Sequence, residues 1–244
     1  MRSPIQTRFE DLPEILPVFP LSGALLLPWG RLPLNIFEPR YLNLVLDSLK
    51  NGRVFGMVQP DYDKSERPKF EAMNLEAMKP TGDGDVLHSD ADEPAVYSVG
   101  CAGRVSSLEE TEDGRLLITL KGLARYRIQN EVEGMKGYRR MRVSYDEFKT
   151  DMEPMAKFDL NRDELLGRLK PYLDAQGMRL NVDAIKGLSE TTLVTSLCMI
   201  CPFDPREKQA LLETPTVEER AKTLLALLQM GAFDTGGKPD GPPQ

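Results

Sequence analysis

Few residues of this 244-residue chain have the types and spacing that chemistry requires. Cys198 and Cys201 form a C-x-x-C pair, which is the spacing of redox and zinc sites. Redox pairs lie at a helix N-terminus, where the dipole lowers the thiol pKa, whereas this pair ends an apolar segment predicted to be a helix. No second C-x-x-C and no nearby histidine completes a zinc site. We interpret both cysteines as buried structural thiols and expect no metal.

Other catalytic groups are also scarce in the sequence. The single histidine, His88, lies in the acidic segment 61–94, which we expect to be a surface loop. Such a loop would not hold an imidazole beside a nucleophile, as covalent catalysis requires. The chain has no G-x-x-x-x-G-K-[ST] phosphate loop. The sequence therefore predicts no catalytic residue and no cofactor, and an enzyme is the least favoured class.

The composition is typical of a globular protein, with 41% hydrophobic residues, 28% charged residues and a formal net charge of −7. The three cysteines lack a disulfide spacing, and the N-terminal region has neither a secretory signal nor an apolar run long enough for a bilayer. We therefore predict a cytoplasmic protein without membrane contact. The acidity argues against nucleic acid as the main partner. Ten acidic residues oppose four basic ones within 61–94, and we expect this charge to be solvated rather than to form an interaction site.

The region 12–150 has the pattern of a β-rich unit with one helix. Short apolar or alternating runs bounded by proline and glycine predict strands, and Asp113-Gly114 predicts a hairpin turn. The helix 40–50 begins after Pro39 and has an apolar stripe of Leu42, Val45, Leu46 and Leu49. The predicted strands are 15–19, 24–27, 31–37, 54–58, 96–108, 115–120, 123–130 and 138–148.

The region 155–231 has a helical period instead. Capping patterns predict four helices, with Asn161 before the first, a second over 191–200, Asp204-Pro205 at the third and Thr216 before a fourth that ends at Met230. We expect these helices to form a bundle, followed by a flexible tail over 232–244. The predicted fold class is therefore α+β.

Several ordered motifs resemble the N-terminal substrate-binding domain of Lon protease. They are L-P-V-F-P-L-S-G-A-L-L-L-P from Leu16, L-P-L-N-I-F-E-P-R-Y from Leu32, F-G-M-V from Phe55, the segments 97–105, 113–115 and 120–128, and E-K-Q-A-L-L-E from Glu207. The resemblance implies a PUA-like pseudo-barrel followed by a helical bundle. The ATPase and peptidase domains of Lon are absent from the sequence, so we expect a stand-alone member of the family. In full-length Lon this region is associated with substrate recognition and assembly.

The motif residues also have structural interpretations. We expect Gly23, Gly100, Gly103 and Gly122 to serve turns or close backbone approaches, and Glu38 and Arg40 to form an ion pair.

The leading hypothesis is a non-enzymatic module that binds unfolded or extended segments of other proteins. An apolar groove where the barrel meets the helices is the expected site, and its candidate lining is Trp29, Leu34, Phe37 and Tyr41, although core packing is an alternative role for each. The second hypothesis is an assembly or adaptor protein that self-associates or docks on one defined partner.

The third hypothesis is RNA binding through a basic strand. Basic residues alternate with Tyr138, Met141 and Val143, which also fits a strand with one solvated face. The candidate patch is Lys136, Arg139, Arg140 and Arg142.

Overall fold

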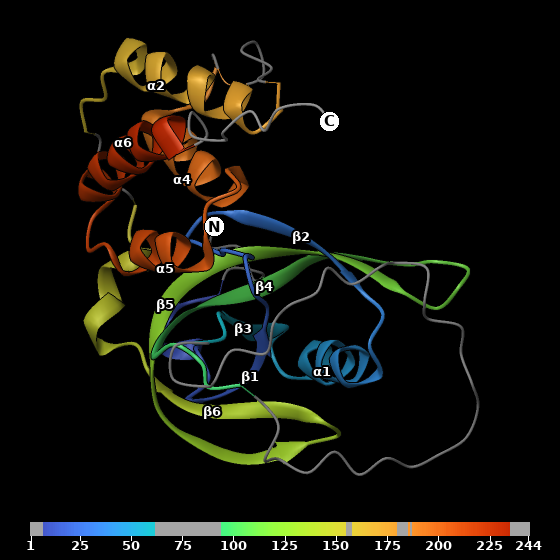
Figure 1. Ribbon diagram of the computed structural model, residues 1–244. Coiled ribbons are helices and arrows are strands. Elements are labelled where there is room, and N and C mark those ends of the chain that lie inside the picture. The colour runs from blue at the N-terminus through green and yellow to red at the C-terminus, as the bar shows by residue number, and fades with distance from the viewer. Residues whose placement is uncertain (1–6, 62–93, 155–157, 180–184, 186, 235–244) are drawn as a thin grey trace.

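The protein is described here by a computed structural model covering residues 7–61, 94–154, 158–179, 185 and 187–234. A six-stranded sheet curls into a near-barrel, and helices stack at one end of it (Figure 1). Most of the acidic loop and most of the tail that the sequence predicts lie outside the described residues. The elements are η1 (Phe9–Asp11), β1 (Ile15–Pro20), β2 (Arg31–Ile36), α1 (Pro39–Lys50), β3 (Val54–Val58), β4 (Val99–Glu110), β5 (Leu116–Met135), β6 (Tyr138–Ser144), η3 (Asp146–Met152), α2 (Arg162–Ala175), α4 (Glu190–Ile200), α5 (Pro205–Glu213) and α6 (Val217–Asp234).

The sheet closes because one long strand pairs with different partners along its length. The strand order is β2-β5-β4-β3-β1-β6, and the second half of β5 also pairs with β6. Only the β1–β3 pair is parallel among the pairings described. The α+β class and the barrel-like sheet expected from the sequence are therefore confirmed.

Strand β5 corrects the prediction of two strands over 115–120 and 123–130. Gly122 continues the ladder instead of turning the chain, and it pairs with Gly103 of β4. A Cβ atom at Gly122 would lie 2.0 Å from the Leu27 carbonyl oxygen. Glycine is needed here because another segment of backbone crosses directly over the strand.

That crossing segment is a second correction. Residues 24–27 form no strand, although Leu25, Leu26 and Leu27 are all buried in the core. Their apolar run correctly predicts burial, but the segment lies across the sheet and pairs with no strand. Only Gly114 of the Asp113-Gly114 turn has a positive φ. The Thr111 backbone N–H donates to the Arg115 carbonyl, so the turn is longer than a two-residue Asp-Gly turn.

Two element boundaries also differ from the prediction. The strand predicted over 138–148 ends at Ser144, where η3 begins shortly after. The buried face of α1 comprises Tyr41, Leu44, Val45 and Ser48, so the predicted stripe has the right period but is displaced by one residue, and Leu46 is exposed. The Glu38–Arg40 ion pair is present at 3.0 Å.

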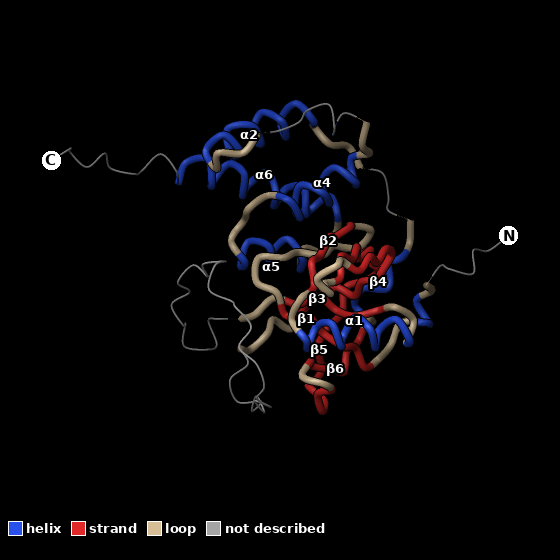
Figure 2. The backbone as a smooth tube through the Cα atoms, turned by 90° about the vertical axis from the view of Figure 1, so that its right-hand side faces the viewer, coloured by secondary structure: helices blue, strands red, loops and turns tan. Residues whose placement is uncertain are grey.

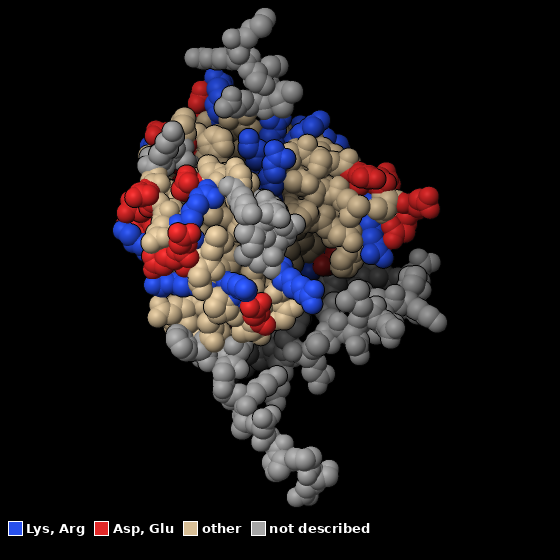
Figure 3. Space-filling model, turned by 90° about the horizontal axis from the view of Figure 1, so that it is seen from above, with Lys and Arg blue, Asp and Glu red and all other residues tan. Residues whose placement is uncertain are grey.

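The helical part follows its capping signals closely. Asn161 caps α2, Asp204 and Glu207 form a capping box on α5, and Thr216 bonds Glu219 at the start of α6. The helices pack together, as expected, with α6 against α2, α4 and α5 (Figure 2). Helix α6 continues to Asp234 instead of ending at Met230, so residues 232–234 are helical and are not part of the predicted tail. A Cβ atom at Gly231 would lie 2.6 Å from the Tyr172 ring, so this close packing needs a glycine. Both signs of charge are interspersed on the face seen from above (Figure 3).

The cysteine pair lies in the core between these helices. Cys198 is fully buried near the end of α4, and Cys201 follows it as the helix cap with 1% exposure. Burial raises the pKa of each of these thiols to about 12, and it also raises that of the buried Cys101. The predicted burial of Cys198 and Cys201 is confirmed.

Helix α5 joins the helical part to the sheet through polar contacts. The Lys208 ammonium donates to the Gly23 carbonyl at 2.6 Å, and the Gln209 amide donates to the Val99 carbonyl at 3.1 Å. From the sheet side, the Gln59 amide donates to the Pro205 carbonyl at 2.8 Å. The E-K-Q motif therefore contributes a helix cap in Glu207 and two bonds to the barrel.

Arg125 of β5 is the most connected residue of this joint. Its guanidinium is buried and forms a two-pronged ion pair with Asp151 in η3, with distances of 2.9 and 2.7 Å. Its other N–H groups donate to the carbonyls of Leu212 at the end of α5 and of Thr214 and Pro215 in the loop that leads to α6. All five guanidinium N–H groups are thus used, so this buried charge has its full set of partners.

We expect Arg125→Met to destabilise the protein by about 3–5 kcal/mol, because it leaves the Asp151 carboxylate and three carbonyls without a donor. The control is Arg127→Met on the same strand, where an exposed Arg127–Glu147 pair is lost. Such pairs contribute about 0–1 kcal/mol. Urea unfolding of both variants measures the difference, and equal losses would contradict the role assigned to Arg125.

We also expect the three thiols of the native protein to be unreactive toward Ellman's reagent at pH 8. A raised pKa keeps each thiol protonated, and burial excludes the reagent. Unfolding in guanidinium should release three reactive thiols. Rapid reaction of Cys198 or Cys201 in the native protein would show that the pair is a reactive site after all.

Candidate functional site

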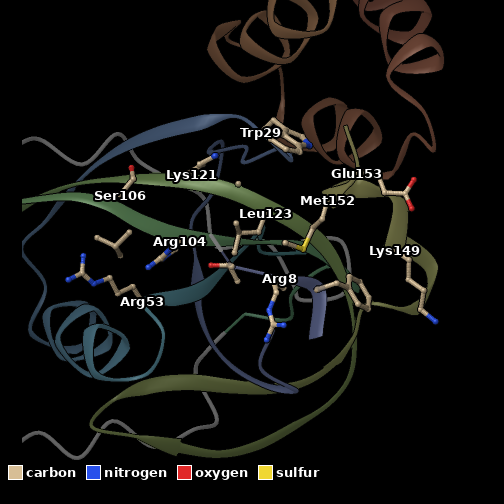
Figure 4. A pocket seen from close by; sticks show the side chains of 14 residues that line it. Arg8, Trp29, Arg53, Arg104, Ser106, Lys121, Leu123, Lys149, Met152 and Glu153 are labelled. Atoms are coloured by element: carbon tan, nitrogen blue, oxygen red, sulfur yellow. The ribbon is translucent and has the colours of Figure 1, made fainter. Parts of the chain in front are cut away.

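A hollow of about 700 Å³ opens beside Trp29 on the outer face of β4 and β5 (Figure 4). The side chains of alternate strand residues line it: Arg104 and Ser106 come from β4, and Lys121 and Leu123 come from β5. Val105 and Gly122, which lie between these residues, are buried and border the hollow from beneath. The alternation of the strands therefore turns Arg104, Ser106, Lys121 and Leu123 toward the hollow.

The walls of the hollow come from parts of the chain that are far apart in sequence. They are the N-terminal segment before β1, the turn that carries Trp29, the turn before β3 and the end of η3. The lining combines apolar and basic side chains, which are Phe9, Trp29, Val105, Leu123 and Met152 together with Arg8, Arg53, Arg104, Lys121 and Lys149; Glu153 is its acidic member.

Trp29 is held rigidly in this wall. Its backbone has a φ of 66°, a left-handed conformation that is unfavourable for a residue with a Cβ. Its backbone N–H donates to the Gly122 carbonyl at 3.0 Å, and its indole N–H donates to the Asp151 carbonyl at 2.8 Å. The side chain is nevertheless 39% exposed. A fixed and partly exposed aromatic ring is a typical contact residue in a binding site.

The strand register places three basic residues in a row next to Trp29. Lys121 of β5 lies opposite Arg31 of β2 on one side and opposite Arg104 of β4 on the other. The Lys121 ammonium lies 5.4 Å from the centre of the Trp29 ring, a cation–π distance. This row makes the potential at the Trp29 end of the hollow positive.

Two other cations of the lining already have acidic partners. Arg8 pairs with Asp11, and its hydrogen bonds are the main cause that lowers the pKa of Asp11. Lys149 pairs with Asp146 at 2.9 Å. These two pairs reduce the positive charge that Arg8 and Lys149 contribute to the hollow.

The four residues proposed for an apolar groove do not line one cavity together. Trp29 lines the large hollow and also a smaller one of about 200 Å³ against α4, where the sheet meets the helices. Leu34 lines a different hollow on the outer sheet, and Phe37 is 53% exposed near Arg115. Tyr41 is buried and stacks on Phe19, with 3.9 Å between ring centres.

The basic strand β6 and its turn place the proposed nucleic-acid patch next to acceptors. Lys136 pairs with Asp47, and this hydrogen bond is the main cause that lowers the pKa of Asp47. Arg139 binds both carboxylate oxygens of Glu131 at 2.7 and 2.6 Å. Arg140 donates to the Glu133 carbonyl at 3.5 Å, and Arg142 lies 3.9 Å from Glu14. Each member of the patch thus has a protein partner.

Arg53, Arg104 and Lys121 were not predicted as site residues from the sequence. Arg104 and Lys121 do lie inside segments that resemble Lon, but there the glycines and apolar residues drew attention. Only the pairing of β4 with β5 brings the two together. Within the described part of the chain, no helix is long and apolar enough to cross a membrane, and no group of three or more potential metal ligands occurs.

Comparison with known proteins gives a consistent set of relatives. The family model of the ATP-dependent protease La (LON) substrate-binding domain matches residues 15–230. The chain is 27% identical over 224 residues to Lon protease 2 of Myxococcus xanthus, covering 90% of this chain and 24% of that protein. It is 25% identical over 232 residues to the Lon protease of Anaeromyxobacter dehalogenans, covering 93% and 24%. The chain thus spans about a quarter of the length of these curated relatives.

A solved structure supports the fold. The crystal structure of a Lon N-terminal domain protein from Xanthomonas campestris superposes with a TM-score of 0.52 at 24% sequence identity. The match covers 87% of this chain and 97% of that one. A likeness at this identity supports the architecture alone, and any ligand of this chain has to be inferred from its own residues.

Proposed function

The chain belongs to the ATP-dependent protease La (LON) substrate-binding domain family, and from this premise we propose that it is a non-enzymatic module that binds extended segments of other proteins. The hollow beside Trp29 is the proposed contact site. Its mixture of apolar and basic groups suits a polypeptide, which presents apolar side chains and polar groups together.

The main support for this proposal is the state of Trp29. Its ring is fixed by two hydrogen bonds from its own residue and is still partly exposed, so binding would require little ordering of this residue. Phe9, Leu123 and Met152 extend the apolar surface next to it. Such a surface can take one or two apolar side chains of an unfolded segment without a deep, selective cavity.

The family match is to a substrate-binding domain rather than to a catalytic one, which favours binding over catalysis. Two other functions would give different results in the same experiments. An assembly or adaptor role would appear as one stoichiometric partner, and RNA binding would appear as an affinity that falls steeply with salt. The acceptors around the basic residues of β6 weigh against the RNA role.

Trp29 is the only tryptophan of the chain, so its fluorescence reports on this site alone. We expect apolar, tryptophan-free peptides and an unfolded protein to shift its emission to shorter wavelength and to protect it from acrylamide, because a bound segment excludes water from the ring. Titrations up to high micromolar concentration measure the effect.

The control is Trp29→Phe combined with Met230→Trp, which moves the single indole to an exposed position on α6. This variant should show no shift. The absence of any change in the wild type, or a change of the same size in the control, would contradict binding at the hollow.

A further inference from the structure

We propose that the hollow selects acidic segments, in which carboxylates flank an apolar or aromatic side chain. This inference rests on the proposed function and names the class of segment that the site takes. It is carried by the charge distribution around Trp29, which the family match does not specify.

The first observation is the row of cations formed by Arg31, Lys121 and Arg104. Cross-strand neighbours have Cβ atoms about 4.5–5.5 Å apart, and like charges in that arrangement oppose each other. The row places three basic side chains side by side next to Trp29, and a carboxylate ligand that lies across it would meet them together.

The second observation is the composition of the lining as a whole. Five basic side chains and one acidic side chain, Glu153, surround the hollow, although the chain has a net charge of −7. Arg53 and Lys121 are both exposed, at opposite sides of Arg104. Two of the five cations pair with nearby carboxylates, so the surplus is smaller than the count, but the lining remains more basic than acidic and favours acidic over basic segments.

The third observation concerns the apolar groups between the cations. Leu123 of β5 and Met152 of η3 lie next to the Trp29 end of the lining, within reach of the same ligand as Lys121 (Figure 4). A segment that alternates carboxylate and apolar side chains would place one set on the cations and the other on this surface. Extended chains have this alternation because successive side chains point in opposite directions.

An RNA strand fits the lining less well. Its bases would need exposed aromatic faces for stacking, and Trp29 already has the Lys121 ammonium near its ring. Its phosphates would need a continuous basic track, whereas Glu153 and apolar residues interrupt the lining. We therefore argue for a polypeptide and treat RNA as an outcome of the test.

The test uses fluorescein-labelled peptides of one design, with leucine and serine at fixed positions and Glu, Gln or Lys at the variable ones. Anisotropy titration of the full chain should give the Glu peptide an affinity about tenfold above the Gln peptide, as expected for several partly exposed ion pairs. The Lys peptide should bind more weakly than both. The advantage of the Glu peptide should shrink as salt rises, because exposed charges are screened.

The variant Lys121→Glu should remove the preference for the Glu peptide over the Gln peptide, because the reversed charge repels the carboxylates of the ligand. The matched control is Lys170→Glu on α2, an exposed lysine that does not line the hollow. It makes the same change in net charge and should keep the preference. Lys121 is exposed, so both variants are expected to fold, and circular dichroism checks this.

The outcomes separate this inference from the proposed function. Equal binding of the Glu and Gln peptides, or equal loss of the preference in both variants, would overturn the acidic preference while peptide binding stands. Binding of none of the three peptides would overturn both proposals. Displacement of the Glu peptide by oligo-uridylate at equal concentration, with a steeper salt dependence than the peptide shows, would overturn the inference in favour of nucleic acid.

Discussion

The buried ion pair between Arg125 and Asp151 is the constraint on which the rest of the structure depends. It links three parts of the chain, since Arg125 lies in the sheet, Asp151 lies in η3 and the three carbonyl acceptors lie at the end of α5 and in the loop after it. A buried guanidinium is stable only when every N–H has an acceptor, so the five bonds fix the relative positions of these parts. Arg220 is also buried, and its guanidinium donates to the Leu211 carbonyl and to the Thr214 carbonyl that Arg125 also binds. These bonds stabilise the same loop.

The same ion pair determines the position of the candidate site. The backbone carbonyl of Asp151 accepts the indole N–H of Trp29, so the residue that holds the arginine also holds the tryptophan. Met152 and Glu153 follow directly and form one wall of the hollow. Gly122, three residues before Arg125, allows the Leu27 backbone to cross the sheet and present Trp29 there. Stability and the shape of the hollow therefore have a common physical origin in the Arg125–Asp151 pair.

Local sequence patterns predicted the features that depend on neighbours in the chain. The caps at Asn161, Asp204 and Thr216, the period of α1 and the burial of the cysteines follow from residues a few positions apart. The segment 24–27 shows the limit, because an apolar run predicts burial but carries no information about whether its backbone pairs with a strand. Gly122 shows the same limit, since a glycine can mark a turn or a close crossing and only tertiary structure separates the two.

The candidate site was harder to predict than the fold because its residues are brought together by the register of the strands and by the backbone segment that crosses the sheet. Trp29 was identified from its residue type. Lys121 and Arg104 can be recognised as neighbours only once the pairing of β4 with β5 is known. The basic strand β6 gave a stronger pattern in the sequence, yet its cations are paired with neighbours such as Glu131 and Asp47.

The central claim, that the hollow beside Trp29 is the contact site, is tested most directly by photo-crosslinking. A bound acidic peptide that carries a benzophenone group would be irradiated, and the attached fragments would be mapped by mass spectrometry. Our account predicts crosslinks on segments 7–9, 104–106, 121–123 and 149–153, which line the hollow. Crosslinks concentrated on β6 or on the outer surface of α2 and α6 would contradict it.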